Sequence, residues 1–193
     1  MQNKFQVHLT LKELDDVSPE LVDYVRLHPN DLKQANTTEI IQKWDGVTPV
    51  IVYKHPGQFQ QTPYKHVFFT HYSDEIAAFK ETHPSLNIGC MAYSLATIKN
   101  LELAGVDYIQ LDIPSSLPDH KLGKIPALET VIPRREEYGW TIMSLNTPVI
   151  IGGIKTLDEF KEVYALTEIA GLVIEKSHIK WADWLKSILE MME

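Results

Sequence analysis

The chain contains the stretch Thr147-Pro-Val-Ile-Ile-Gly-Gly-Ile-Lys-Thr156, which is followed by Gly171-Leu-Val-Ile-Glu-Lys-Ser-His178. Each part holds an uninterrupted run of apolar, largely β-branched residues. A run of this kind, without a polar face, is typical of a parallel strand that is covered on both sides. Between the two runs, Thr156 and Glu159 form a capping box, which is a signature of a helix start. The stretch therefore predicts two parallel strands joined by a helix.

The same alternation extends through the whole chain. Eight short runs rich in Val, Ile, Phe and Tyr are candidate strands, at Phe5–Leu9, Tyr24–Leu27, Pro49–Tyr53, His66–Thr70, Asn87–Ala92, Asp107–Leu111, Pro148–Ile151 and Gly171–Ile174. Helical segments lie between many of them, and an apolar stripe from Trp181 to Met192 predicts a last helix that packs on the sheet. Eight strands alternating with helices predict a compact (βα)8 TIM barrel, and a doubly wound open sheet is the alternative.

Length and connections refine this prediction. The 193 residues show no internal repeat or linker, so we expect a single domain spanning residues 1–193. A barrel this short needs shortened connections, and the segments Asp15–Val22 and Pro56–Lys65, which carry Pro or Gly, are expected to provide them. The segment Pro114–Thr147 is longer and is expected to contain a mobile loop, which is a candidate lid.

Composition and charge exclude several classes of protein. The 18 basic and 26 acidic residues give a net charge of −8, which disfavours a general nucleic-acid binder. No stretch approaches the ~18 apolar residues that a membrane-spanning helix needs, and the N-terminus lacks an apolar leader segment. Cys90 is the only cysteine, so it forms no internal disulfide. We expect a cytoplasmic protein without a membrane partner.

Ligands of such barrels bind at the carboxyl ends of the strands, and the residues there are strongly polar. They are His8, Thr10, Arg26, His28, Lys54, His55, Thr70, His71, Tyr93, Asp112, Gly152, Gly153, Glu175, Lys176 and Ser177. Gly152 and Gly153 let the backbone approach a ligand closely, while Lys176 and Ser177 add a charge and a hydroxyl donor at a helix start. These four residues predict a phosphate site, and a purely turn-making role for the glycines is the alternative.

Three residues are candidates for proton transfer. His28 and His71 carry imidazoles, which accept and donate protons close to neutral pH, and Asp112 is the third candidate. Arg26 faces the same way as His28 because side chains alternate across a strand. We expect Arg26, Lys54 and Tyr93 to contact the substrate. Lys121 would reach it from the long loop, and the alternative is that Lys121 is an exposed surface lysine.

Other kinds of chemistry find less support. No helical His-x-x-x-His or Glu-x-x-His spacing occurs, and Arg26 and Lys54 would repel a divalent metal, so we expect no metal and no cofactor. Cys90 lies within an apolar strand, where a small hydrophobic role is commoner than a nucleophilic one. The predicted partner is a small phosphorylated molecule, and a homo-oligomer is compatible with the sequence.

Several motifs together resemble a known family. They are Ile88-Gly-Cys-Met-Ala-Tyr-Ser-Leu95, Ala104-Gly-Val-Asp-Tyr-Ile-Gln-Leu111, Lys121, Pro148-Val-Ile-Ile-Gly-Gly-Ile154 and, more weakly, Arg26-Leu-His-Pro-Asn-Asp-Leu32. They are similar to motifs of thiamine-phosphate synthase and its TenI-like relatives. The resemblance implies a phosphate-binding barrel, and in the TenI-like branch it implies an enzyme that tautomerises a thiazole phosphate.

Departures from that family narrow the expectation. Its synthases carry Asn-Asp-Arg after the third strand for a magnesium diphosphate, whereas this chain has Lys54-His55-Pro56. Tyr93 stands where a histidine is usual, and Met91 stands where a serine is usual. The resemblance therefore implies a phosphate ester that is bound without metal.

A second resemblance gives an alternative from another functional class. The sequences Gly152-Gly-Ile-Lys-Thr156 and Lys176-Ser-His-Ile-Lys-Trp181 are also similar to the glycerol-3-phosphate-responsive antiterminator proteins. That resemblance implies a non-enzymatic protein that senses a phosphate ester and acts on mRNA. The net negative charge of the chain disfavours RNA binding, because RNA phosphates carry the same sign. A third hypothesis is a relative that has lost catalysis and binds only proteins. The first two interpretations predict the same phosphate pocket.

Overall fold

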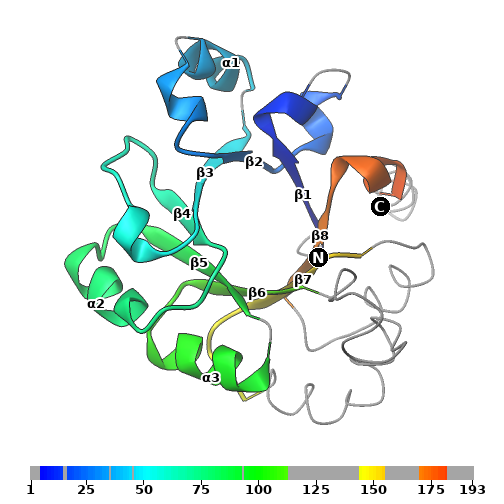
Figure 1. Ribbon diagram of the computed structural model, residues 1–193. Coiled ribbons are helices and arrows are strands. Elements are labelled where there is room, and N and C mark those ends of the chain that lie inside the picture. The colour runs from blue at the N-terminus through cyan, green and yellow to red at the C-terminus, as the bar shows by residue number, and fades with distance from the viewer. Residues whose placement is uncertain are drawn as a thin grey trace, which may run out of the picture.

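The computed structural model describes residues 5–14, 17–34, 36–44, 46–92, 94–112, 144–154 and 170–181 (Figure 1). The strands are β1 (Phe5–Thr10), β2 (Tyr24–Leu27), β3 (Thr48–Tyr53), β4 (His66–Phe69), β5 (Asn87–Ala92), β6 (Tyr108–Asp112), β7 (Val149–Gly152) and β8 (Gly171–Ile174). Each strand pairs in parallel with the next, and β8 pairs with β1, so the sheet closes into a barrel. The barrel prediction is therefore confirmed over the open sheet.

Helices surround this barrel, and two of its connections are short. The described α-helices are α1 (Thr37–Lys43), α2 (Glu75–Thr82) and α3 (Leu95–Leu103), and they lie outside the ring of strands (Figure 1). Between β1 and β2 the described residues form only the 3-10 turns η1 (Leu11–Glu13) and η2 (Pro19–Leu21). Between β3 and β4 they form only η4 (Pro56–Gln58). Both expected shortened connections are thus present.

Three sequence predictions concern segments that are mostly not described. The helix expected from Thr156 and the last helix beyond Trp181 lie outside the described residues. The same holds for the candidate lid, of which only the end from Ser144 to Thr147 is described. That end is held by α3, because the Glu102 carboxylate accepts the backbone N–H groups of Asn146 and Thr147, both at 3.0 Å.

The core divides into two sets of side chains, as expected of strands whose residues alternate between two faces. The larger set faces the surrounding helices and includes Val7, Leu9, Val25 and Leu27. The smaller set lies inside the barrel and consists of Val50, Val52, Phe68 and Met91, packed against Tyr24 and Tyr108. Cys90 is buried in β5 within the larger set, as predicted, and burial raises the pKa of its thiol to about 12.

Aspartates secure the amino ends of two strands. Asp23 precedes β2, and its Oδ2 accepts the N–H of Val7 at 2.7 Å. Asp107 precedes β6, and its Oδ2 accepts a hydrogen bond from the N–H of Ile88 at 2.6 Å. The same oxygen forms an ion pair with Nζ of Lys80 at 2.5 Å. These bonds tie each strand to an earlier one at the end of the barrel opposite the carboxyl ends.

Among the described residues, no helix combines the length and the apolar character needed to cross a bilayer.

Gly89 tests the packing inside the barrel. A Cβ at this position of β5 would lie 2.0 Å from Cζ of Tyr108, so the ring occupies the space that any side chain would need. We expect Gly89→Ala to lower the free energy of unfolding in urea by about 1–3 kcal/mol, because overpacking displaces a buried ring. The control is Gly57→Ala, whose Cβ would lie 3.3 Å from the His55 side chain at an exposed site. Equal stability losses in both variants would contradict this packing.

Candidate functional site

An arginine side chain crosses the barrel interior close to the carboxyl ends of the strands. Arg26 lies one residue before the end of β2, and Gln110 lies two residues before the end of β6. Strands β2 and β6 are four places apart in the eight-stranded ring, so they face each other across the barrel. Nη2 of Arg26 donates to Oε1 of Gln110 at 2.6 Å. The guanidinium carbon lies 5.1 Å from the ring centroid of Phe68 on β4.

His8 holds the other side of the guanidinium group. Nε of Arg26 donates to Nδ1 of His8 at 3.2 Å, so Nδ1 carries no proton. The proton of the neutral ring is then on Nε2, which donates to Oε1 of Gln6 at 3.0 Å. Burial, reinforced by the charge of Arg26, holds the pKa of His8 well below its usual value. His8 is therefore a neutral positioning group for Arg26.

The charge of Arg26 is not matched by a carboxylate in the described part of the chain. Its partners there are His8, Gln110 and the ring of Phe68, all of them neutral. A half-buried cation without a counter-ion is costly, and the cost falls when an anion enters. The arrangement suits an anionic ligand above the barrel interior.

The residues of the predicted phosphate site follow two neighbouring strands. Gly152 is buried at the end of β7, and Gly153 comes next with φ of +71°, a left-handed conformation that favours glycine. Strand β8 pairs with β7 and leads through Glu175 into η5 (Lys176–His178), which contains Lys176 and Ser177. The topology thus brings these four residues to adjacent strand ends.

A hollow of about 570 Å³ lies between the segments that follow β2 and β3. It is lined by His28, Pro29 and Asn30 on one side and by Gly57, Gln58, Phe59 and Gln60 on the other. His28 is exposed, and its backbone N–H donates to Oδ2 of Asp31 at 2.8 Å. Lys54, exposed at the end of β3, donates its backbone N–H to Oε1 of Gln58 at 3.2 Å. The exposed imidazole of His28 therefore borders the hollow, and the backbone of Lys54 is bonded to a residue of its lining.

Of the remaining predicted residues, only His71 has a described side chain. His71 is exposed just after β4, and its Nδ1 lies 2.9 Å from Oγ1 of Thr70. Asp112 ends β6, but its side chain lies outside the description. Tyr93 and Lys121 lie wholly outside the described residues. Of the three residues proposed for proton transfer, His28 and His71 thus follow strands β2 and β4.

The expectation for His8 needs a correction. The sequence analysis placed His8 at a strand end, whereas β1 continues for two more residues to Thr10 and His8 is buried. Gln6 and Gln110, which complete the network, did not stand out in the sequence. A signal was present in β6, where Gln110 is a lone amide between Ile109 and Leu111 in an otherwise apolar run.

The neutral state of His8 predicts a pH dependence of stability. Its folded-state pKa lies below the unfolded value of about 6.5, so the unfolded chain binds more protons as the pH falls below that value. We expect the free energy of unfolding to be highest above about pH 6.5 and to decline toward pH 5. In His8→Gln, which keeps an acceptor for Arg26, that decline should be shallower. Denaturant unfolding between pH 5 and 7.5 measures how the free energy of unfolding depends on pH, with His71→Gln as the exposed control. An equal pH dependence in the wild type and in His8→Gln would refute a neutral, buried His8.

Comparisons with known proteins identify the fold. No protein-family model matches the chain, and no curated protein matches it. Solved structures do match. The thiamine phosphate pyrophosphorylase of Pyrococcus furiosus shares 18% identity at a TM-score of 0.62, with 98% of this chain and 97% of that chain covered. At these levels of identity such matches establish a common fold.

Two further structures have the same architecture. The N-acetylmannosamine-6-phosphate 2-epimerase of Clostridium perfringens is 11% identical, with a TM-score of 0.56 over 96% of this chain and 93% of that one. The glycerol uptake operon antiterminator regulatory protein of Listeria monocytogenes is 14% identical, with a TM-score of 0.56 over 89% of this chain and 91% of that one. Both families suggested by the sequence motifs are thus represented among proteins with this barrel.

Proposed function

We propose that this barrel binds a small phosphorylated molecule at the carboxyl ends of its strands. The observation that carries the proposal is Arg26, a half-buried cation whose described partners are all neutral. A guanidinium group presents several N–H donors in one plane, which suits the oxygens of a phosphate. Arg26 would approach the ligand from the floor of the site.

The rim would supply further contacts to the phosphate. Gly153 has a left-handed backbone and no side chain, so a ligand can approach its main chain closely. Lys176 and Ser177 follow the neighbouring strand. In this proposal Gly152 and Gly153 offer backbone contact, Lys176 offers charge and Ser177 offers a hydroxyl donor. Lys54 and Tyr93 would also contact the substrate, and Lys121 would reach the phosphate from the long loop.

The reaction that fits best is proton transfer in a diverged TenI-like or thiamine-phosphate-synthase-like enzyme. Support comes from the motif resemblance and from the barrel shared with a thiamine phosphate pyrophosphorylase. His28, His71 or Asp112 would remove a proton from the bound ester and return it at another atom, as a tautomerisation requires. A thiazole phosphate is the substrate that the resemblance suggests.

A phosphate-ester sensor is the second candidate function. It is favoured by two neighbours of the same fold, an antiterminator regulatory protein of Listeria monocytogenes and an antiterminator-related protein of Thermotoga maritima. The same pocket would then bind the ester without turnover, and RNA binding would depend on the ligand.

The shift of the melting temperature on adding phosphate compounds tests the phosphate site. The panel consists of inorganic phosphate, diphosphate with and without magnesium, thiazole phosphate, thiamine phosphate and glycerol 3-phosphate. A ligand at ~100 times its dissociation constant stabilises the folded state by about 2.7 kcal/mol, which corresponds to about 5–10 °C for a chain of this size. We expect one ester to give such a shift and Lys176→Ala to lose most of it.

The matched control is Lys65→Ala. Lys65 is an exposed lysine just before β4, at the opposite end of the barrel from Lys176, so its loss should leave the shift unchanged. The phosphate site is wrong if no compound stabilises the protein or if Lys176→Ala keeps the full shift.

Turnover distinguishes the two candidate functions. With the stabilising ester as substrate, we expect His28→Ala or His71→Ala to lower kcat by at least about 100-fold, which is typical for loss of a general acid or base. Full turnover in both variants would overturn their assignment. If the ester binds without turnover, RNA binding measured with and without the ester tests the sensor, which predicts a ligand-dependent affinity that falls steeply with salt.

A further inference from the structure

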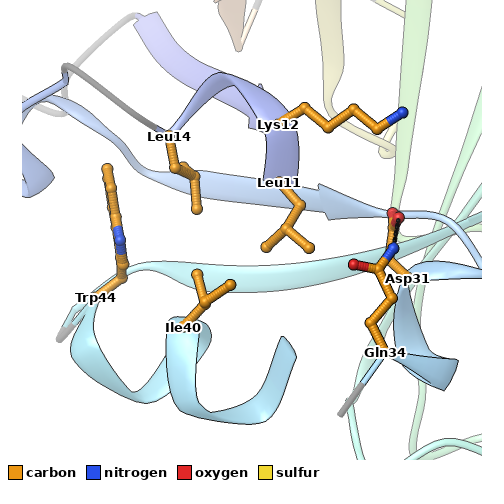
Figure 2. A pocket seen from close by; sticks show the side chains of 7 residues that line it. All are labelled: Leu11, Lys12, Leu14, Asp31, Gln34, Ile40 and Trp44. Carbon is orange, nitrogen blue, oxygen red and sulfur yellow. Dashed lines mark hydrogen bonds between the residues drawn. The ribbon is translucent and has the colours of Figure 1, made fainter. Parts of the chain in front are cut away.

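A second pocket lies on the outer side of the barrel, between the segments that follow β1 and β2. It has a volume of about 260 Å³ and lies between η1, η3 (Asp31–Lys33) and α1 (Figure 2). It is lined by Leu11, Lys12, Leu14, Asp31, Gln34, Ile40 and Trp44. The short 3-10 turns between β1 and β2 explain this hollow, because a full crossover helix would have packed beside α1.

The pocket has an apolar end and a polar end. Figure 2 shows Leu11 and Leu14 from one wall facing Ile40 and Trp44 from the other. Leu11, Ile40 and Trp44 are partly buried and pack against the main core, of which Leu14 is a buried member. At the opposite end Asp31 and Gln34 lie together, and Lys12 extends from the facing wall with its ammonium group apart from them (Figure 2). A ligand here would bury an apolar body at one end and present polar groups at the other.

The polar end contains one charge of each sign, and the two do not neutralise each other. Both residues belong to the described part of the chain, and no ion pair joins the Lys12 ammonium to the Asp31 carboxylate, so the two groups are more than 4.0 Å apart. Oδ2 of Asp31 accepts the N–H of His28, and Oδ1 accepts the amide of Gln34 at a long 3.4 Å. The carboxylate therefore keeps capacity for a cationic donor.

We propose that this pocket binds a free amino acid with an apolar side chain. The carboxylate of the ligand would pair with Lys12, its ammonium group with Asp31, and its side chain would lie among Leu11, Ile40 and Trp44. A fatty acid would leave Asp31 beside a like charge, and an alkyl amine would leave Lys12 beside one. The volume is below the ~300–1,000 Å³ of sites for drug-sized ligands, which suits a compact molecule.

Calorimetric titration of the full chain tests this proposal with L-leucine and L-phenylalanine as probes. Three truncated compounds separate the contributions of the ligand: 4-methylpentanoate lacks the ammonium group, 3-methylbutylamine lacks the carboxylate, and glycine lacks the apolar side chain. We expect at least one of the two amino acids to bind, and each truncated compound to bind at least tenfold more weakly.

Variants assign the binding to this pocket. We expect Lys12→Gln to weaken amino-acid binding at least tenfold, whereas Lys43→Gln, an exposed lysine on α1 outside the lining, leaves it unchanged. Ile40→Trp fills the apolar end and should abolish binding, while its circular dichroism and melting transition report whether it remains folded. Asp31 is a poorer first variant because it also holds the backbone of His28.

Three results would overturn the proposal. They are no binding of either amino acid, equal binding of a compound that lacks one of the charges, and unchanged affinity in Lys12→Gln. The inference does not depend on the phosphate site. Stabilisation by a phosphate ester should persist in Ile40→Trp, so a failure at one site is distinguishable from a failure at the other.

Discussion

One guanidinium group links opposite walls of this barrel. Arg26 reaches from β2 to Gln110 on β6, while His8 accepts its second hydrogen bond and Phe68 offers its ring. Taking a cation partly out of water is costly, and these neutral partners recover only part of that cost. Two properties of the site follow from this constraint. His8 has to stay neutral, and the interior keeps a positive charge that favours an anion at the strand ends.

The shortened connections lie beside both hollows described above. Between β3 and β4 the turn η4 replaces a helix, and residues 57–60 border the hollow beside His28. Between β1 and β2 the turns η1 and η2 replace a helix, and the outer pocket opens beside α1. Asp31 connects the two, because it lines the outer pocket and holds the backbone of His28. A short chain thus has concave surfaces where larger barrels have helices.

The fold could be predicted from sequence more fully than the site. Eight apolar runs indicated the eight strands, because strands that are buried on both faces contain few polar residues. The predicted bounds differ from those of the structure by one residue at some ends. The alternation of Arg26 and His28 was also readable. The pairing of Arg26 with Gln110 was not, because 84 residues separate them and only closure of the barrel brings them together. The short connection between β1 and β2 was predicted, but the outer pocket beside it was not, because the pocket depends on how η1 packs against η3 and α1.

The central claim is that Arg26 carries the charge that receives the anion, and side-chain NMR tests it most directly. The chain has three arginines, Arg26, Arg134 and Arg135, so their Nε–H signals are few, and Arg26→Lys identifies the one of interest. During a titration with inorganic phosphate at constant ionic strength, we expect the Arg26 signal to shift saturably and more than the other two. An unchanged Arg26 signal at phosphate concentrations that stabilise the protein would contradict this account.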